Sequence, residues 1–255
     1  MMRRVLLPCM LAFSMSASAL DLDKLKARLN ELEQPAATSN ASASKPTGLG
    51  QFTAQEQTDS LKQALTQGAE TAVRNLAKEN GYLGNDKVRI PLPENLQKAD
   101  RTMRRFGLGK YSDELITSMN RAAEAAVPEA KALLIGAVKN MTVTDAKDIL
   151  LGNDDAATQY FRRNTETALG EKFKPIVNQS MQKVSLAQTY DRFAGKGVKL
   201  GLVKQQDANL DDYITRKALD GLFLMMAEQE KEIRAHPLQA VGDLAKKVFS
   251  ALRGQ

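Results

Sequence analysis

The spacing of apolar residues predicts helices along most of the chain. Between Thr53 and Gly81 the apolar residues recur every three or four positions, which places them on one helix face: Leu61, Leu65, Ala69, Ala72, Val73 and Leu76. A second run of this kind follows Ser112, which we expect to cap a helix that continues to Ala126. Between them, residues 86–93 cannot be helical throughout, because their two prolines lack a backbone donor and force the preceding residue to be extended.

Helix-breaking and helix-capping residues divide the middle of the chain into further helices. A helix is predicted to end at Phe106, before a glycine-rich turn, and Pro128 stands where a new helix would begin. Thr142, followed three residues later by Asp145, forms a capping-box pattern that opens a short helix ending at Gly152.

Two long helices are predicted in the last hundred residues. The first runs from Asp155 to about Val184, with a bend near Gly170 and Pro175. A basic glycine-rich loop over residues 195–201 follows. Asn209 or Asp211 then caps a helix to Ala235, and a final amphipathic helix ends at Leu252. Since no stretch alternates as a strand would, we predict an all-α protein, a single multi-helix bundle domain over residues 51–255.

Residues 1–19 have the pattern of a secretory signal peptide. Arg3 and Arg4 form its basic start, residues 5–15 are apolar but too few to remain as a membrane anchor, and residues 17–19 are small. Cys9 lies inside the apolar stretch, which does not fit a lipidation site. We therefore expect cleavage after Ala19 and a soluble periplasmic protein that is not a lipoprotein.

The next segment predicts a short amphipathic helix over residues 20–33 on a tether over residues 34–50. Leucines at positions 22, 25, 29 and 32 form one seam, and the tether is rich in Ala, Ser, Thr, Pro and Gly without periodicity. Such a helix is too small to be a domain. It docks on the main body, pairs with a second copy or lies on a membrane surface, and these alternatives stay open.

Signal cleavage changes both the charge and the cysteine count. The chain shortens from 255 residues to 236, its formal net charge falls from +6 to +4, and its only cysteine is lost. The mature protein then has neither a disulfide nor a thiol nucleophile. A mild positive charge is compatible with an anionic surface, but it does not indicate nucleic acid as a partner, and no transmembrane segment remains.

Four motifs stand out: Ile90-Pro91-Leu92-Pro93, SMNRAAE at residues 118–124, DDAATQYF at 154–161 and KALDGLF at 217–223. Together they resemble an exported bacterial family labelled domain of unknown function 4197. The resemblance spans about residues 61–249. It implies an exported, mostly helical protein without an assigned reaction. It carries over no catalytic residues.

Two runs place adjacent aspartates three residues before a threonine, at Asp154-Asp155 and at Asp211-Asp212. They resemble the magnesium-binding motifs of isoprenoid synthases, which need a third carboxylate at the position where both runs have threonine. We expect these aspartates to cap helix N-termini, where free N–H groups and the positive dipole end favour carboxylates.

A metal site is the remaining interpretation of the acidic residues. Asp145 and Asp148 share a helix face, and Asp154 and Asp155 follow after the turn. Four carboxylates could hold a hard cation such as calcium, although the spacing differs from that of an EF-hand loop. The prediction remains that the chain binds no metal.

Polar residues within apolar helices are the other candidates for a ligand-binding site. Asp220 lies on a helix that is apolar on every face. We expect it either to form an ion pair, with Arg216 or Lys217 one turn back or with another helix, or to line an internal pocket. Asn120 and Glu124 border an alanine-rich face, with Arg121 expected to pair with Glu124 on the solvent side. If a ligand site exists, we expect it among eight residues: Asn120, Glu124, Asp154, Asp155, Thr158, Tyr160, Tyr213 and Asp220.

The sequence lacks the residues and motifs on which several common classes of enzyme depend. The chain has one histidine, His236, and no tryptophan, and it has no phosphate-binding glycine loop. We therefore expect no cofactor and a non-catalytic binding or interaction protein, with a small or lipid-like ligand between helices or a protein partner. The alternative is a carboxylate enzyme, with or without a metal, that uses Asp154, Asp155 and Asp220.

Overall fold

The computed structural model describes residues 48–253, except 108, 184–186, 188–208 and 240–241. These residues belong to one compact unit, residues 45–255. All the regular structure in the described ranges is helical, which confirms the all-α prediction. The predicted signal peptide, the helix over residues 20–33, most of the tether and the loop over 195–201 lie outside the described residues.

The helices follow one another with short connections. Their bounds are η1 (Gly48–Gln51), α2 (Ala54–Leu76), α3 (Glu94–Arg105), α4 (Gly109–Ala126), η2 (Val127–Glu129), α5 (Ala130–Asn140), α6 (Val143–Leu151), α7 (Ala156–Met181), α9 (Leu210–Ala235), η4 (Pro237–Gln239) and α10 (Asp243–Arg253).

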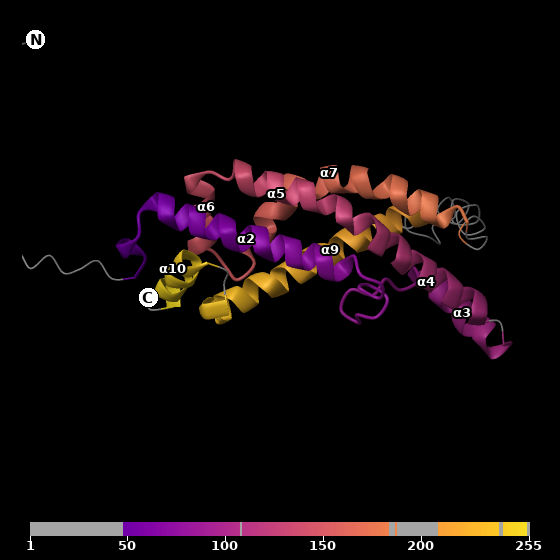
Figure 1. Cartoon of the computed structure of the whole chain (residues 1–255). Coiled ribbons are helices and arrows are strands. Elements are labelled where there is room, and N and C mark those ends of the chain that lie inside the picture. The colour runs from indigo at the N-terminus through magenta and orange to yellow at the C-terminus, as the bar shows by residue number, and fades with distance from the viewer. Residues whose placement is uncertain (1–47, 108, 184–186, 188–208, 240–241, 254–255) are drawn as a thin grey trace, which may run out of the picture. The chain divides into compact units, whose positions relative to one another are not determined.

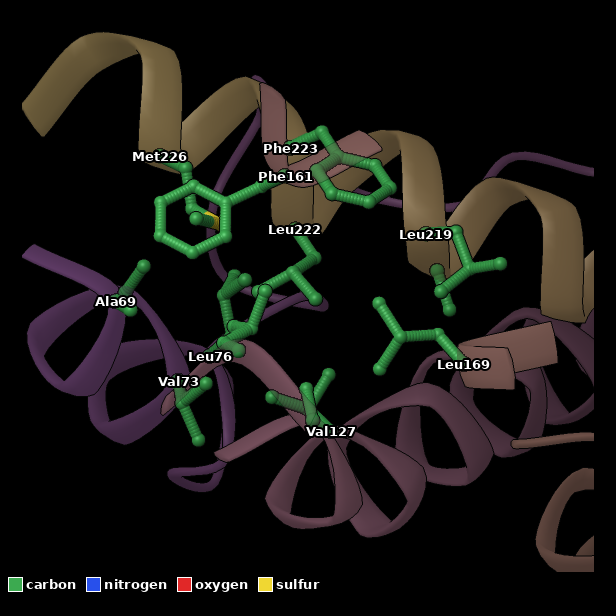
Figure 2. Close-up of a cluster of buried hydrophobic side chains, with 14 of the residues drawn as sticks. Ala69, Val73, Leu76, Val127, Phe161, Leu169, Leu219, Leu222, Phe223 and Met226 are labelled. Carbon is green, nitrogen blue, oxygen red and sulfur yellow. The ribbon is translucent and has the colours of Figure 1, made fainter. Parts of the chain in front are cut away.

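The long helices α7 and α9 pack along each other, and α2, α4 and α5 pack around them (Figure 1). Figure 2 shows apolar side chains of α2, η2, α7 and α9 meeting in the core. Leu76, Phe161 and Phe223 are almost completely buried there. Each such side chain contributes about 1.5–3 kcal/mol through burial. The face of α2 that the apolar spacing predicts is the face that is buried.

Three predicted helix starts are confirmed by their hydrogen bonds. Thr53 and Glu56 form a reciprocal capping box at the start of α2. Thr142 and Asp145 form another at the start of α6. Asn209, one of the two alternatives for α9, accepts a hydrogen bond from the N–H of Asp212 at 2.9 Å. These caps satisfy N–H groups that have no partner within the helix.

Other local predictions differ from the structure. Helix α4 begins at Gly109, so Ser112 lies inside it and bonds the Asp100 carboxylate of α3 instead of capping. Helix α7 is continuous through Gly170 and Pro175. Because Pro175 lies on the exposed face, the carbonyl that loses its helical partner one turn earlier can bond water. Residues 48–50 of the predicted tether form part of η1, where Leu49 is buried.

None of the helices in the described ranges combines the length and the apolar character that crossing a bilayer requires.

Candidate functional site

The segment between α2 and α3, residues 77–93, is held by side chains of α4. Asn120 is completely buried. Its Oδ1 accepts from the Ile90 N–H at 2.8 Å, and its Nδ2 donates to the Ile90 carbonyl at 3.0 Å and to the Ile116 carbonyl at 2.8 Å. A buried backbone group without a partner costs about 1–3 kcal/mol. Asn120 therefore fixes the path of the chain at Ile90.

The Glu124 carboxylate binds the same segment one turn further along α4. Its Oε1 accepts from the N–H groups of Tyr82 at 3.1 Å and Leu83 at 3.2 Å, and its Oε2 accepts from Arg121 at 2.5 Å. The predicted pair of Arg121 and Glu124 is thus confirmed. The prediction that this pair lies on the solvent side is wrong for Glu124, whose side chain is only 6% exposed. The N–H groups of residues 82 and 83 supply the partners that make this burial tolerable.

Helix α9 binds the other side of segment 77–93. The Tyr82 hydroxyl donates to the Ala218 carbonyl at 2.7 Å, and the Tyr213 hydroxyl donates to the Pro91 carbonyl at 2.9 Å. Burial, and after it the charge of Glu124, raises the pKa of the Tyr82 phenol. A Cβ atom on Gly221 would lie 2.7 Å from Cε1 of Tyr82, so the absence of a side chain lets the ring pack directly on the helix.

A surface hollow of about 160 Å³ lies between the same segment and α9. Its charged lining residues are Lys87, Arg89, Lys217 and Asp220. Lys87 is paired with Glu228 at 2.5 Å. Three cations and one carboxylate make the hollow mildly attractive to a small anion, although such exposed charges interact weakly.

Asp220 lies at the edge of this hollow and pairs with Arg162 of α7 at 3.5 Å. A pair with another helix is one of the alternatives that the sequence left open. The expected position in an internal pocket is wrong, because the side chain is 46% exposed. The apolar neighbours of Asp220 along α9 pack to either side of it and leave its carboxylate at the surface.

The N-terminus of α7 is capped from another helix. Glu230 of α9 is buried; its Oε1 accepts from the Ala157 N–H at 2.9 Å. Its Oε2 accepts from the N–H and the hydroxyl of Thr158, at 2.9 and 3.0 Å. Arg234 donates to Glu230 at 2.9 Å and to the Ile149 carbonyl at 2.7 Å. The free N–H groups and the positive dipole end of α7 favour this carboxylate.

The expected capping of α7 by Asp154 and Asp155 is therefore wrong. Asp155 occupies the N-cap position, but its side chain accepts no capping hydrogen bond. It accepts one from the Gln159 side chain at 3.0 Å instead, and Asp154 is exposed. Tyr160, in the first turns of α7, donates to the Ala137 carbonyl at 3.0 Å. Glu230, and not Asp155, bonds these N–H groups, because the packing of α9 against α7 places the Glu230 carboxylate at the N-terminus of α7.

The carboxylates considered for a metal are engaged locally or exposed. Hydrogen bonds from the Thr142 side chain and backbone hold the pKa of Asp145 below its usual value. Asp148 and Asp154 are exposed. Within the described ranges, no three His, Cys, Asp or Glu side chains come together as metal ligands would.

The structure brings the eight predicted site residues together in two places. Asn120, Glu124, Tyr213 and Asp220 gather around segment 77–93, and the other four lie at the start of α7. Sequence reasoning missed Glu230. A signal existed, because Glu230 follows Phe223 by seven residues and Met226 by four, and so continues the buried face of α9.

A groove of about 380 Å³, which we call the α2–α6 groove, lies between α6 and the start of α2. Its lining is mainly apolar: Leu49, Gly50, Ala54, Gln57, Thr58, Val143, Ala146, Lys147, Leu150 and Leu151. Val143 and Leu151 are 47% and 59% exposed. Two smaller hollows beside α2 and α9 measure only about 20 Å³ each, room for about one water molecule.

Sequence reasoning missed this groove as well. Its signal is the run of residues 149–151, all apolar. At 100° per residue, three successive side chains span about 200° of a helix and cannot all face one core.

A family model described as Protein of unknown function (DUF4197) matches residues 51–250 of the chain. No curated protein and no solved structure matches it.

Proposed function

Because the chain belongs to the DUF4197 family of proteins of unknown function, we propose its function from its geometry. The protein binds a lipid-like ligand, with an apolar chain and an anionic head, in the α2–α6 groove, and it catalyses no reaction on this ligand. The observation that carries the proposal is an apolar groove that leaves two large aliphatic side chains of α6 exposed.

The size and the lining of the groove support an apolar ligand chain. Pockets for small molecules measure about 300–1,000 Å³ and are mostly apolar. At about 380 Å³ the α2–α6 groove falls within this range, whereas the two smaller hollows do not. A bound chain would cover Val143 and Leu151, at a gain of roughly 25 cal/mol for each Å² of apolar surface removed from water.

The charge at the groove supports an anionic head. Lys147 is the one charged residue in the described lining, and no carboxylate lines it. The amide of Gln57 already donates to the carbonyls of Leu49 and Phe52, both at 3.0 Å. A carboxylate or phosphate head would therefore bind the Lys147 ammonium.

The contacts of the predicted site residues support a role without catalysis. Asn120, Glu124, Thr158, Tyr160 and Tyr213 all direct polar atoms to backbone or side-chain partners within the protein. A general acid or base must reach the proton it transfers in a bound substrate. These groups instead hold segment 77–93 and the start of α7 in place.

Titration of the purified protein with a fluorescent fatty acid, below its micelle concentration, tests the proposal. We expect saturable binding at one site, with at least tenfold weaker affinity for L151R, which places a charge in the groove. L224R is the matched control, since Leu224 is 42% exposed but lies outside the groove. K147Q should weaken binding by about fivefold through the loss of one ion pair.

Two results would contradict the proposal. One is the absence of saturable binding, and the other is equal affinity in L151R and L224R. A melting temperature near that of the unchanged protein would show that both variants fold, so that a loss of binding reports on the groove.

We also propose that the protein is exported and works in the periplasm, which rests on the pattern of residues 1–19. Intact mass and N-terminal sequencing of the protein from the periplasmic fraction test this. We expect an N-terminus at Leu20; an unprocessed chain that stays with the cytoplasmic fraction would contradict it.

A further inference from the structure

The turn between α3 and α4 presents two aromatic side chains to solvent among basic residues. Phe106 is 76% exposed and Tyr111 is 56% exposed. Residues 101–111 contain four cations and no carboxylate. We call Phe106, Tyr111, Arg105 and Lys110 the basic aromatic tip. A single exposed apolar side chain is ordinary on a protein surface, whereas two aromatics beside several cations indicate an interaction surface.

Local contacts build this tip and leave its charges free. Gly107 has a φ of +76°, which allows the tight reversal between the helices. Arg104 pairs with Asp100 of α3 at 2.9 Å and with Asp113 of α4 at 2.5 Å. The single positive charge of Arg104 therefore faces two carboxylates, and this cluster keeps a net charge of −1. Arg105 and Lys110 pair with no carboxylate of the described chain.

The position of the hairpin leaves the tip accessible. Helix α3 packs mainly on α4. In Figure 1 the α3–α4 hairpin lies at the opposite end of the described unit from α6 and α10. The tip is thus separate from the α2–α6 groove.

We propose that the basic aromatic tip docks the protein on the surface of an anionic phospholipid bilayer. Phe106 and Tyr111 enter the headgroup region, and Arg105 and Lys110 bind the lipid phosphates. Aromatic side chains favour this region because one part of the ring system is apolar and, in tyrosine, the other is polar. Cations near an anionic leaflet are attracted to its negative surface potential.

The chemistry of the tip favours a lipid bilayer over a pocket on a partner protein. The tip has long basic side chains beside two exposed aromatics, and an anionic bilayer offers phosphates to the first and an interfacial region to the second. Two negative charges oppose the attraction: the one that Arg104 leaves uncompensated on Asp100 and Asp113, and that of Glu114, which is exposed one turn beyond Lys110. Salt should therefore weaken binding strongly, because screening reduces the attraction of the few exposed cations.

Vesicle flotation of the purified protein tests whether the cations of the tip bind anionic lipid. We expect recovery with vesicles containing phosphatidylglycerol, little with phosphatidylcholine alone, and loss of recovery in 1 M salt. The double variant R105Q/K110Q should bind about 25-fold more weakly, at about fivefold for each cation. K172Q/K231Q is the charge-matched control, since both lysines are exposed on other helices, α7 and α9.

A fluorescent reporter tests whether the tip itself enters the lipid. The chain has no tryptophan, so F106W introduces a single one. Brominated phosphatidylglycerol should quench its emission. L238W is the matched control, because Leu238 is also 76% exposed but lies in η4.

The reporter also separates the tip from the predicted helix over residues 20–33. Binding with F106W unquenched would place the contact elsewhere and overturn the proposal. Equal quenching of F106W and L238W would overturn it too, as would unchanged vesicle binding in R105Q/K110Q.

Discussion

The side-chain amide of Asn120 pairs with the backbone of Ile90 through two hydrogen bonds, of 2.8 and 3.0 Å, as a neighbouring strand would. The two residues are thirty positions apart in the chain. Since segment 77–93 contains no helix or strand of its own, its path depends on such partners.

Replacing Asn120 by alanine should destabilise the fold strongly. N120A leaves the N–H and the carbonyl of Ile90 buried without a partner, at about 1–3 kcal/mol each, so we expect a loss on the order of 3 kcal/mol. Urea unfolding followed by circular dichroism measures it. N75A is the control, because Asn75 is exposed, and its change should stay within about 0.5 kcal/mol. Equal effects of the two variants would contradict the role of Asn120.

The start of α7 should depend on Glu230 and not on the adjacent aspartate. E230Q removes the buried charge that accepts from Ala157 and Thr158 and leaves Arg234 without its anionic partner, so we expect a loss of about 3 kcal/mol. D155N should change the free energy of unfolding by no more than about 0.5 kcal/mol. A larger effect of D155N than of E230Q would restore the local capping that the sequence predicts.

Two helical glycines should respond to alanine with opposite signs. In G221A the new Cβ would meet Tyr82 at 2.7 Å and Val88 at 3.2 Å, and we expect a loss of about 1–3 kcal/mol from overpacking. In G136A it would meet nothing within 4 Å, and the higher helix propensity should stabilise the protein by about 0.5–1 kcal/mol. Thermal melts of both variants check the signs, and stabilisation of both would show that segment 77–93 does not pack closely on α9.

The buried Tyr82 phenol should make stability fall at alkaline pH. Its pKa is raised in the folded protein, mainly by burial, whereas an ordinary tyrosine titrates near pH 10. Above about pH 10 the unfolded chain loses this proton and the folded protein keeps it, so the contribution to stability decreases as the pH rises. At pH 8, Y82F should cost about 1 kcal/mol through the hydrogen bond to Ala218.

Urea unfolding between pH 8 and pH 11 measures this linkage. The difference between Y82F and the unchanged protein should shrink as the pH rises. Y111F is the control for removing a phenol from the half-exposed position 111. A difference that stays constant with pH would mean that Tyr82 does not contribute to the alkaline loss of stability.

Helices and several of their ends could be predicted because their signals are local. The apolar face of α2 is set by residues three and four positions apart, and the capping boxes at Thr53 and Thr142 join residues three positions apart. Family membership also followed from short motifs, and the match over residues 51–250 confirms it. The all-α class could be predicted without knowing which helices pack against each other.

The partners of the polar residues could not be predicted in this way. The sequence shows that Glu124, Asp155 and Asp220 are unusual where they stand, but their surroundings come from distant segments. Glu124 is buried because residues 82 and 83 offer it N–H groups, and Asp220 is exposed because its apolar neighbours take the core positions.

The sequence by itself therefore determined that the chain is all-α, where most of its helices begin, and which faces they bury, because helix formation depends on neighbours within one or two turns. Only the tertiary structure decided that Glu230 caps α7 in place of Asp155, that Asn120 holds Ile90, and that α2 and α6 leave an apolar groove between them. A hydrogen bond or a groove between remote segments depends on how whole helices pack, and this packing is a property of all their side chains together.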